Sequence, residues 1–185
     1  CEQSGLEVAA VYGRGLGGNT NTDVDVAHKL RLMDIAERLD CSRIVTGGVP
    51  KSRNPDLQPM IETLKLLAPE ASRRGMLLCL ENHCNFNLET IDDYRKVFKA
   101  VNEPCLGICI DTGHFDAANV PLDEVVDALG DRVNHIHVKE NQGKGKVDFR
   151  RFGEGTTDNH RLVSRMLERG YEGFITVELS PQRDR

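Results

Sequence analysis

The sequence has no apolar run that approaches the ~20 residues of a membrane-spanning helix, and no segment resembles a signal peptide. It has no CxxC pair of the kind that holds zinc. Basic residues are outnumbered, with 24 Lys and Arg against 29 Asp and Glu and a net charge of −5. These absences argue against a membrane protein, a zinc-finger module and a nucleic-acid-binding surface.

What remains is typical of one globular domain over residues 1–185, with 39% hydrophobic and 29% charged residues. Three of the six cysteines, Cys79, Cys105 and Cys109, lie in apolar strand-like runs, where a cysteine usually acts as a small buried hydrophobe. We therefore expect reduced thiols and a cytoplasmic location.

Short apolar runs alternate with amphipathic stretches along the whole chain. The predicted strands are residues 6–12, 42–46, 76–81, 106–111, 133–138 and 174–179. Apolar positions three or four apart predict helices within 57–71, 91–101 and 162–167. Asp56 and Asp158 are expected to cap helix starts, and Gly75 and Gly170 to follow helix ends.

Strict alternation of strands and helices predicts a parallel sheet with right-handed crossovers, either doubly wound or closed as a (β/α)₈ barrel. The GRGLGG segment at 13–18 fits the GxGxxG spacing of a dinucleotide site, but the polar residues that follow it do not predict the helix that such a site needs. We interpret it as a flexible loop followed by further polar loop. The barrel is favoured, and no organic cofactor is expected.

Ionisable residues stand near the ends of four successive predicted strands: Glu81, Asp111, His137 and Glu178. Such residues are costly in apolar strands unless they are paired or bind a metal. In a barrel those strand ends converge on one mouth. His135, on the same face as His137 but one layer deeper, is interpreted as a core histidine or a support for the ligands.

Three carboxylates and one imidazole form an oxygen-rich set that favours Mn²⁺ or Mg²⁺, with Co²⁺ or Zn²⁺ as alternatives. A buried ion-pair network is the competing explanation. We expect few Lys or Arg near these strand ends, so that the carboxylates would repel one another without a metal.

The segments LENHCNF, ICIDTGHFD, VNHIHVKEN, RFGEGTTD and GYEGFITVEL together resemble the xylose isomerase-like barrel family. The resemblance implies a TIM barrel whose metal is held by Glu81, Asp111, His137 and Glu178. It also implies that His114 contacts substrate, and we add His83 and Lys139 as substrate-binding candidates. One departure is Gly143, which stands where ketose 3-epimerases of the family carry an arginine.

A full barrel has eight strands and ~250 residues, whereas six strands are predicted here. Residues 1–5 resemble the tail of a second helix. We therefore expect a barrel that lacks its first two strands and its last helix.

The resulting functional hypothesis is a metal-dependent sugar isomerase or epimerase of carbohydrate metabolism. It would act through a cis-enediolate, with Glu81 and Glu178 as acid and base. The partner is a small sugar or polyol, with a homo-oligomer possible. The alternatives are a sugar or inosose dehydratase, an endonuclease IV-like phosphodiesterase and an inactive barrel fragment. The phosphodiesterase would use basic residues of 139–151, which we otherwise interpret as a solvated loop.

Overall fold

The main sheet of the protein is parallel and follows the order of the chain. The computed structural model describes residues 4–19 and 21–179. Six strands lie in the order β1-β2-β3-β4-β5-β8, and every neighbouring pair is parallel. They are β1 (Val11–Tyr12), β2 (Arg43–Gly47), β3 (Leu77–Glu81), β4 (Leu106–Asp111), β5 (Val133–Val138) and β8 (Ile175–Val177). Because spatial order equals sequence order, the sheet is wound in one direction, as in a (β/α) barrel.

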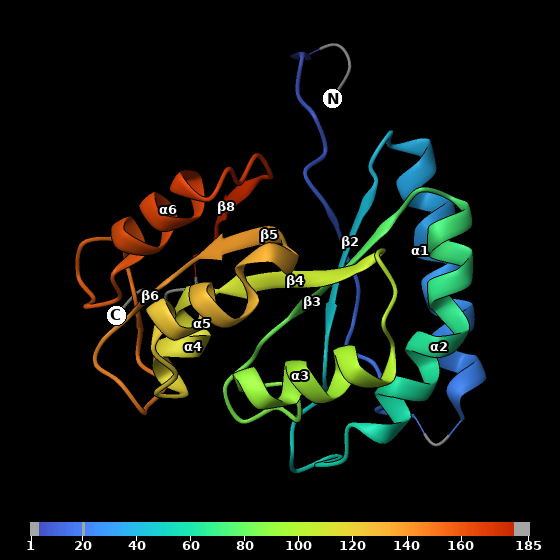
Figure 1. Ribbon diagram of the computed structural model, residues 1–185, viewed down its shortest axis with the longest axis horizontal. Helices are drawn as coiled ribbons and strands as arrows, with labels where there is room; N and C mark the ends of the chain where they lie inside the picture. Colours follow the sequence, from blue (N-terminus) through green and yellow to red (C-terminus); the bar gives the residue numbers. More distant parts are fainter. Residues whose placement is uncertain (1–3, 20, 180–185) are drawn as a thin grey trace, which may run out of the picture.

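The helices lie around the outside of this curled sheet (Figure 1). They are α1 (Thr22–Arg38), α2 (Gln58–Arg73), α3 (Ile91–Ala100), α4 (Thr112–Ala117), α5 (Leu122–Leu129) and α6 (Asn159–Glu168), with a 3₁₀ turn at Gly130–Arg132. A short antiparallel hairpin, β6 (Glu140–Asn141) with β7 (Phe149–Arg150), follows β5. Within the described part of the chain, no helix has the length and apolarity to cross a membrane.

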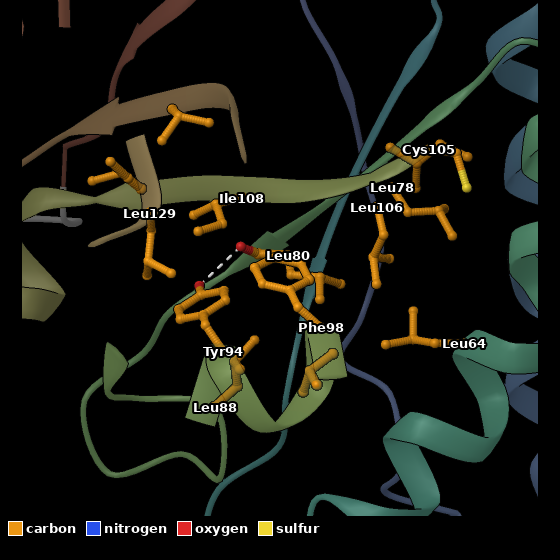
Figure 2. Packing of buried hydrophobic residues seen from close by; sticks show 14 of the residues in the cluster. Leu64, Leu78, Leu80, Leu88, Tyr94, Phe98, Cys105, Leu106, Ile108 and Leu129 are labelled. Atoms are coloured by element: carbon orange, nitrogen blue, oxygen red, sulfur yellow. Dashed lines mark hydrogen bonds between the residues drawn. The ribbon is translucent and has the colours of Figure 1, made fainter. Parts of the chain in front are cut away.

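The larger hydrophobic core lies between the outer face of the sheet and the helices. Leu78, Leu80 and Ile108 point outward and are fully buried, packed with the helix residues Leu64 and Tyr94 (Figure 2). The Tyr94 hydroxyl donates a hydrogen bond of 2.9 Å to the backbone carbonyl of Leu80. This contact satisfies the only polar atom of a ring that is otherwise apolar.

The inner face of the sheet is different, because successive side chains of a strand point to opposite faces. Val45, Cys79 and Cys109 form a second, small cluster there, packed by Ala10 and Leu77. The expected burial of Cys79, Cys105 and Cys109 is confirmed, and all five cysteines in the described residues are free.

Most predicted elements are confirmed, with β4 and β5 matching the predicted ranges and β1 and β8 shorter than predicted. Asp158 caps α6 by accepting from the Arg161 amide. Gly75 and Gly170 follow α2 and α6 with φ of 65° and 82°, a region that favours glycine. Asp56 accepts from the Gln58 amide at the start of α2, although Leu57 is the N-cap residue. The helix tail expected at residues 1–5 lies mostly outside the described residues.

The polar loop expected after the glycine segment is wrong, because α1 fills it. Its apolar stripe is weak since two of its inward positions hold Asp25 and Lys29, which are 2% and 0% exposed. Asp25 accepts from the Gly17 amide at 3.0 Å, and the Lys29 ammonium donates to the Arg14 carbonyl. The buried charges therefore fasten the glycine loop to the helix.

The solvated loop expected at residues 139–151 is only partly correct. Its two ends pair as the β6–β7 hairpin, and Asp148 forms ion pairs with Lys146 and Arg150. The hairpin brings Phe149 back toward the ends of the parallel strands, where the predicted ligands stand.

Candidate metal centre

The four predicted ligands converge. One ligand atom from each of Glu81, Asp111, His137 and Glu178 lies within 4.8 Å of the others. Glu81 and Asp111 end β3 and β4, His137 is the fifth residue of β5, and Glu178 follows β8. Register explains the meeting: Asp111 pairs with His137, and the Glu178 amide donates to the Val138 carbonyl at 3.0 Å.

His137 lies between the two glutamates. Its Nδ1 is 2.5 Å from Glu81 Oε1 and 3.3 Å from Glu178 Oε2. Glu81 and Asp111 are 1% and 0% exposed, whereas the Glu178 side chain is 37% exposed. The centre thus has a buried side on β3 and β4 and an accessible side at β8.

A cation does accompany the carboxylates, so the expectation of few Lys or Arg at the strand ends needs correction. Lys139 Nζ lies 2.6 Å from Glu178 Oε1 and 3.7 Å from Asp111 Oδ2. Lys139 is two residues after His137 and therefore shares its face. Gly113 makes room, since a Cβ there would stand 3.0 Å from the Lys139 stem.

Neighbouring groups offset the effect of burial to different degrees for the three ionisable groups Asp111, His137 and Glu178. Burial raises the pKa of Asp111 to about 8, and Lys139 offsets only part of that desolvation. Burial also opposes the charge of His137, but hydrogen bonds to Glu178 and Glu81 outweigh it and raise the pKa of His137 to about 9. The same hydrogen bond, with help from Lys139, lowers the pKa of Glu178 against the effect of burial.

Two buried carboxylate oxygens show that the residues fit a divalent cation. Glu81 Oε2 and Asp111 Oδ2 have no hydrogen-bond partner among the described residues, although both are shielded from solvent. A buried carboxylate oxygen without a donor is costly, and a hard divalent ion coordinated by carboxylate oxygens removes that cost. The donor set, three carboxylates and an imidazole, suits such an ion.

Hydrogen bonds behind the ligands fix their backbone. Asn82, fully buried, donates to the Asp111 carbonyl and accepts from the Asp111 amide, at 3.0 and 2.8 Å. Asp111 Oδ1 accepts from the His114 amide and so caps α4. Thr112 Oγ1 accepts from the Lys139 amide at 2.9 Å. These contacts join β3, β4 and β5 at the point where the ligands emerge.

The predicted substrate-binding residues line one side of the centre. His83 Nε2 is 3.7 Å from Glu81 Oε2, and the His83 ring lies 4.3 Å from the His114 ring. The ring centroid of Phe149 is 4.7 Å from that of His114 and 4.5 Å from Lys139 Nζ, which lies over the Phe149 ring. The Phe86 ring stacks on the His83 ring. We call His83, Phe86, His114 and Phe149 the aromatic wall.

Sequence reasoning missed the two phenylalanines of the aromatic wall, as well as Asn82. Phe149 reaches the wall only because the β6–β7 hairpin folds back, a long-range event with no local signal. Asn82 directly follows a predicted ligand on the strand, and that adjacency was a usable signal.

The chain belongs to the xylose isomerase-like TIM barrel family, which it matches over residues 1–185. This confirms the resemblance and the fold class. Among curated relatives, it is 29% identical over 123 residues to fructoselysine 3-epimerase of Escherichia coli O157:H7, covering 65% of this chain and 44% of the relative. It is 24% identical over 148 residues to inosose dehydratase of Yersinia enterocolitica, covering 70% and 49%. The chain thus spans about half the length of these relatives.

Solved structures agree on the fold. A D-tagatose 3-epimerase-like protein superposes with a TM-score of 0.80 at 23% identity, covering 95% of this chain and 71% of that one. The IolI protein with bound zinc gives 0.77 at 18% identity, covering 94% and 67%. A Mycobacterium smegmatis xylose isomerase-like barrel in complex with magnesium gives 0.73 at 20% identity, covering 96% and 68%.

Proposed function

We propose that the protein is a divalent-metal-dependent sugar isomerase or epimerase in which Glu81 and Glu178 act on the substrate as acid and base. The observation that carries the proposal is the convergence of four ligand atoms within 4.8 Å of one another. Two of the carboxylates, Glu81 and Asp111, each have a buried oxygen without a hydrogen-bond partner within residues 4–19 and 21–179. The similarity to fructoselysine 3-epimerase supports the reaction class.

Glu81, Asp111, His137 and Glu178 would hold the ion. When bound, a divalent ion would supply a Lewis acid that polarises a substrate carbonyl and acidifies the neighbouring C–H. The zinc and magnesium bound to structural neighbours support a divalent ion, and the oxygen-rich donor set favours Mn²⁺ or Mg²⁺.

The different surroundings of the two glutamates support a mechanism with two proton-transfer groups. They come from different segments, Glu81 from the buried end of β3 and Glu178 from the accessible segment after β8. One carboxylate, in its ionised form, removes the proton from the substrate carbon, and the other, which must carry a proton of its own, donates that proton to the adjacent carbon or to the opposite face. Lys139, 2.6 Å from Glu178, keeps that carboxylate in the ionised form, which is the form that accepts a proton, and also lowers its basicity.

The aromatic wall would orient the substrate. Burial, with His83 and Lys139 nearby, lowers the pKa of His114 to about 2, so the ring is neutral at working pH. His114 Nδ1 accepts from the Cys84 amide at 3.2 Å, which leaves Nε2–H free to donate to a substrate hydroxyl. Phe149 and Phe86 offer apolar ring surface to the C–H face of a sugar or cyclic polyol.

A dehydratase is the second candidate, supported by the similarity to inosose dehydratase. The same proton abstraction precedes loss of a β-hydroxyl group. Lys139, buried beside the proton-transfer residue Glu178, supplies a hydrogen-bond donor that could assist departure of that hydroxyl.

The test is product analysis of the Mn²⁺-loaded protein with a panel of ketoses and inososes in D₂O. An isomerase or epimerase yields a product of unchanged composition with deuterium at the reacting carbon, whereas a dehydratase yields a product that has lost water. The proposal fails if neither product forms with any member of the panel at saturating Mn²⁺, or if products form equally with Asp111→Asn. Asp131→Asn, at a side chain 91% exposed, is the matched control.

A further inference from the structure

We propose that the protein has a second, thiolate-containing metal site formed by Cys109, His135 and His137, one layer below the carboxylate centre. One ligand atom from each of the three lies within 4.8 Å of the others. Cys109 and His135 are paired in the register of β4 and β5, and each stands two residues before a ligand of the carboxylate centre. We call this set the deep cluster.

The unpaired nitrogen of His135 points to a ligand. His135 is 1% exposed, and its Nε2 hydrogen-bonds Thr176 Oγ1 at 3.0 Å, while its Nδ1 has no partner in the part of the chain that the structure describes. A buried imidazole nitrogen without a partner is costly. The hydrogen bond on Nε2 also fixes the orientation of the ring, as second partners do for metal-binding histidines.

The donor set differs from the one above it. One sulfur and two imidazole nitrogens suit a borderline or soft ion such as Zn²⁺ or Co²⁺, not Mg²⁺ or Mn²⁺. An ion in this site would be about 2.3 Å from the sulfur and about 2.0 Å from each nitrogen. The three ligand atoms must therefore come about 1 Å closer to one another than they are without the ion. Rotation of side chains on the inner face can provide this.

The proton and charge balance is simple. The S–H bond of Cys109 breaks, its proton goes to solvent, and the sulfur forms a bond to the ion, with no change of oxidation state. A thiolate with a divalent ion leaves one net positive charge inside the barrel. Glu81 and Asp111, whose buried oxygens lack partners, lie in the layer above and offset it.

His137 belongs to both clusters, so an ion in the deep cluster would share this imidazole with the carboxylate centre. Two cations on one imidazole repel each other. Zn²⁺ in the deep cluster would therefore weaken binding of a second divalent ion at the carboxylate centre.

Titration with Co²⁺ as the probe tests the deep cluster, because a cobalt–thiolate bond gives a charge-transfer band in the near ultraviolet and a carboxylate site does not. We expect the band in the wild-type protein, its loss in Cys109→Ser and Cys109→Ala, and affinity weakened roughly tenfold or more in His135→Gln. Cys79→Ser is the matched control, since Cys79 is equally buried on the inner face but outside the cluster. It should keep the band, as should Cys84→Ser.

Two outcomes would overturn the proposal: no band at saturating Co²⁺ in the wild-type protein, or a band that survives replacement of Cys109. If the Cys109 variants do not fold, anomalous scattering from crystals of the wild-type protein grown with Co²⁺ decides. It should place cobalt about 2.3 Å from the Cys109 sulfur, and cobalt bound only by Asp111 and the glutamates refutes the deep site. Asp111→Asn should keep the band, so failure of the proposed function and failure of this inference are distinguishable.

Discussion

Along β3, β4 and β5 the side chains that point outward are aliphatic, whereas those that point inward are mostly thiols, imidazoles and carboxylates. The outward set is Leu78, Leu80, Ile108, Ile110 and Ile136; the inward set is Cys79, Glu81, Cys109, Asp111, His135 and His137. Both sets are buried, so burial alone does not distinguish them. The outward residues lose only water when they are buried, which stabilises the fold. The inward residues lose hydration that only partners or an ion can replace.

Substitutions on the two faces should therefore change different quantities. An outward substitution should lower the free energy of unfolding and leave the metal affinity of the folded protein unchanged. An inward substitution should change metal binding or catalysis with little effect on unfolding. The variants below test whether the two faces differ in this way.

The largest expected effect is that of Glu178→Gln on turnover. The amide keeps the shape and one metal-facing oxygen but cannot exchange a proton, so kcat should fall by about 10²–10⁴-fold. Because the Glu178 side chain is 37% exposed at the edge strand, the free energy of unfolding should hardly change. Steady-state kinetics and calorimetric measurement of Mn²⁺ binding check both points.

Glu172→Gln, at an exposed carboxylate nearby in sequence, is the control and should behave as wild type. Normal turnover of Glu178→Gln would refute the two-glutamate mechanism. Turnover in D₂O that leaves the reacting carbon unlabelled would instead indicate a hydride shift between carbons.

On the outward face, Leu80→Ala should lower the free energy of unfolding by about 2–5 kcal/mol. Leu80 is fully buried between β3 and the helices, so truncation leaves a cavity in the core (Figure 2). Urea denaturation measures the loss, and Leu66→Ala, at a residue 57% exposed on α2, should change stability by less than about 0.5 kcal/mol. A Leu80→Ala protein that is folded but has weakened Mn²⁺ affinity would break the division between the faces.

The alternation that separates the faces is also what made the site predictable from the sequence. Charged residues inside apolar runs, such as Asp111 at the end of 106–111, marked both a strand end and a candidate ligand. The strength of that signal comes from the cost of a buried charge, which ordinary core positions do not carry.

The sequence pattern did not identify polar residues that are buried for a local structural purpose. Asp25 and Lys29 are buried charges that fasten a loop, and they hid the helical period of α1. The position of Phe149 in the aromatic wall depends on how segments that are distant in the sequence fold back. The same is true of the closeness of Lys139 to Asp111. Such contacts follow from tertiary packing, which no local pattern encodes.

Asp111→Asn should weaken Mn²⁺ binding by about a hundredfold or more, since even supporting residues of metal sites typically cost 10–100-fold. Asparagine keeps the oxygen that accepts from the His114 amide, so the start of α4 should be preserved. Mn²⁺ at a hundred times its Kd should stabilise the wild-type protein by about 2.7 kcal/mol. Removal by a chelator should reverse this. An equal Mn²⁺-dependent shift of Tm in the variant would contradict the assignment of Asp111 as a ligand.

The smallest effect is expected for His114→Asn, which tests whether the aromatic wall binds substrate without taking part in proton transfer. The depressed pKa of His114, about 2, keeps the ring uncharged at any working pH, so it can donate one hydrogen bond but cannot serve as a base near neutrality. Loss of a single hydrogen bond is worth about 0.5–1.5 kcal/mol. We therefore expect KM to rise by up to roughly tenfold while kcat and the shape of its pH profile stay unchanged. His160→Asn, at an exposed histidine of α6, is the matched control. A fall in kcat comparable to that of Glu178→Gln would place His114 in the proton path, and the candidate centre would then have a third proton-transfer group.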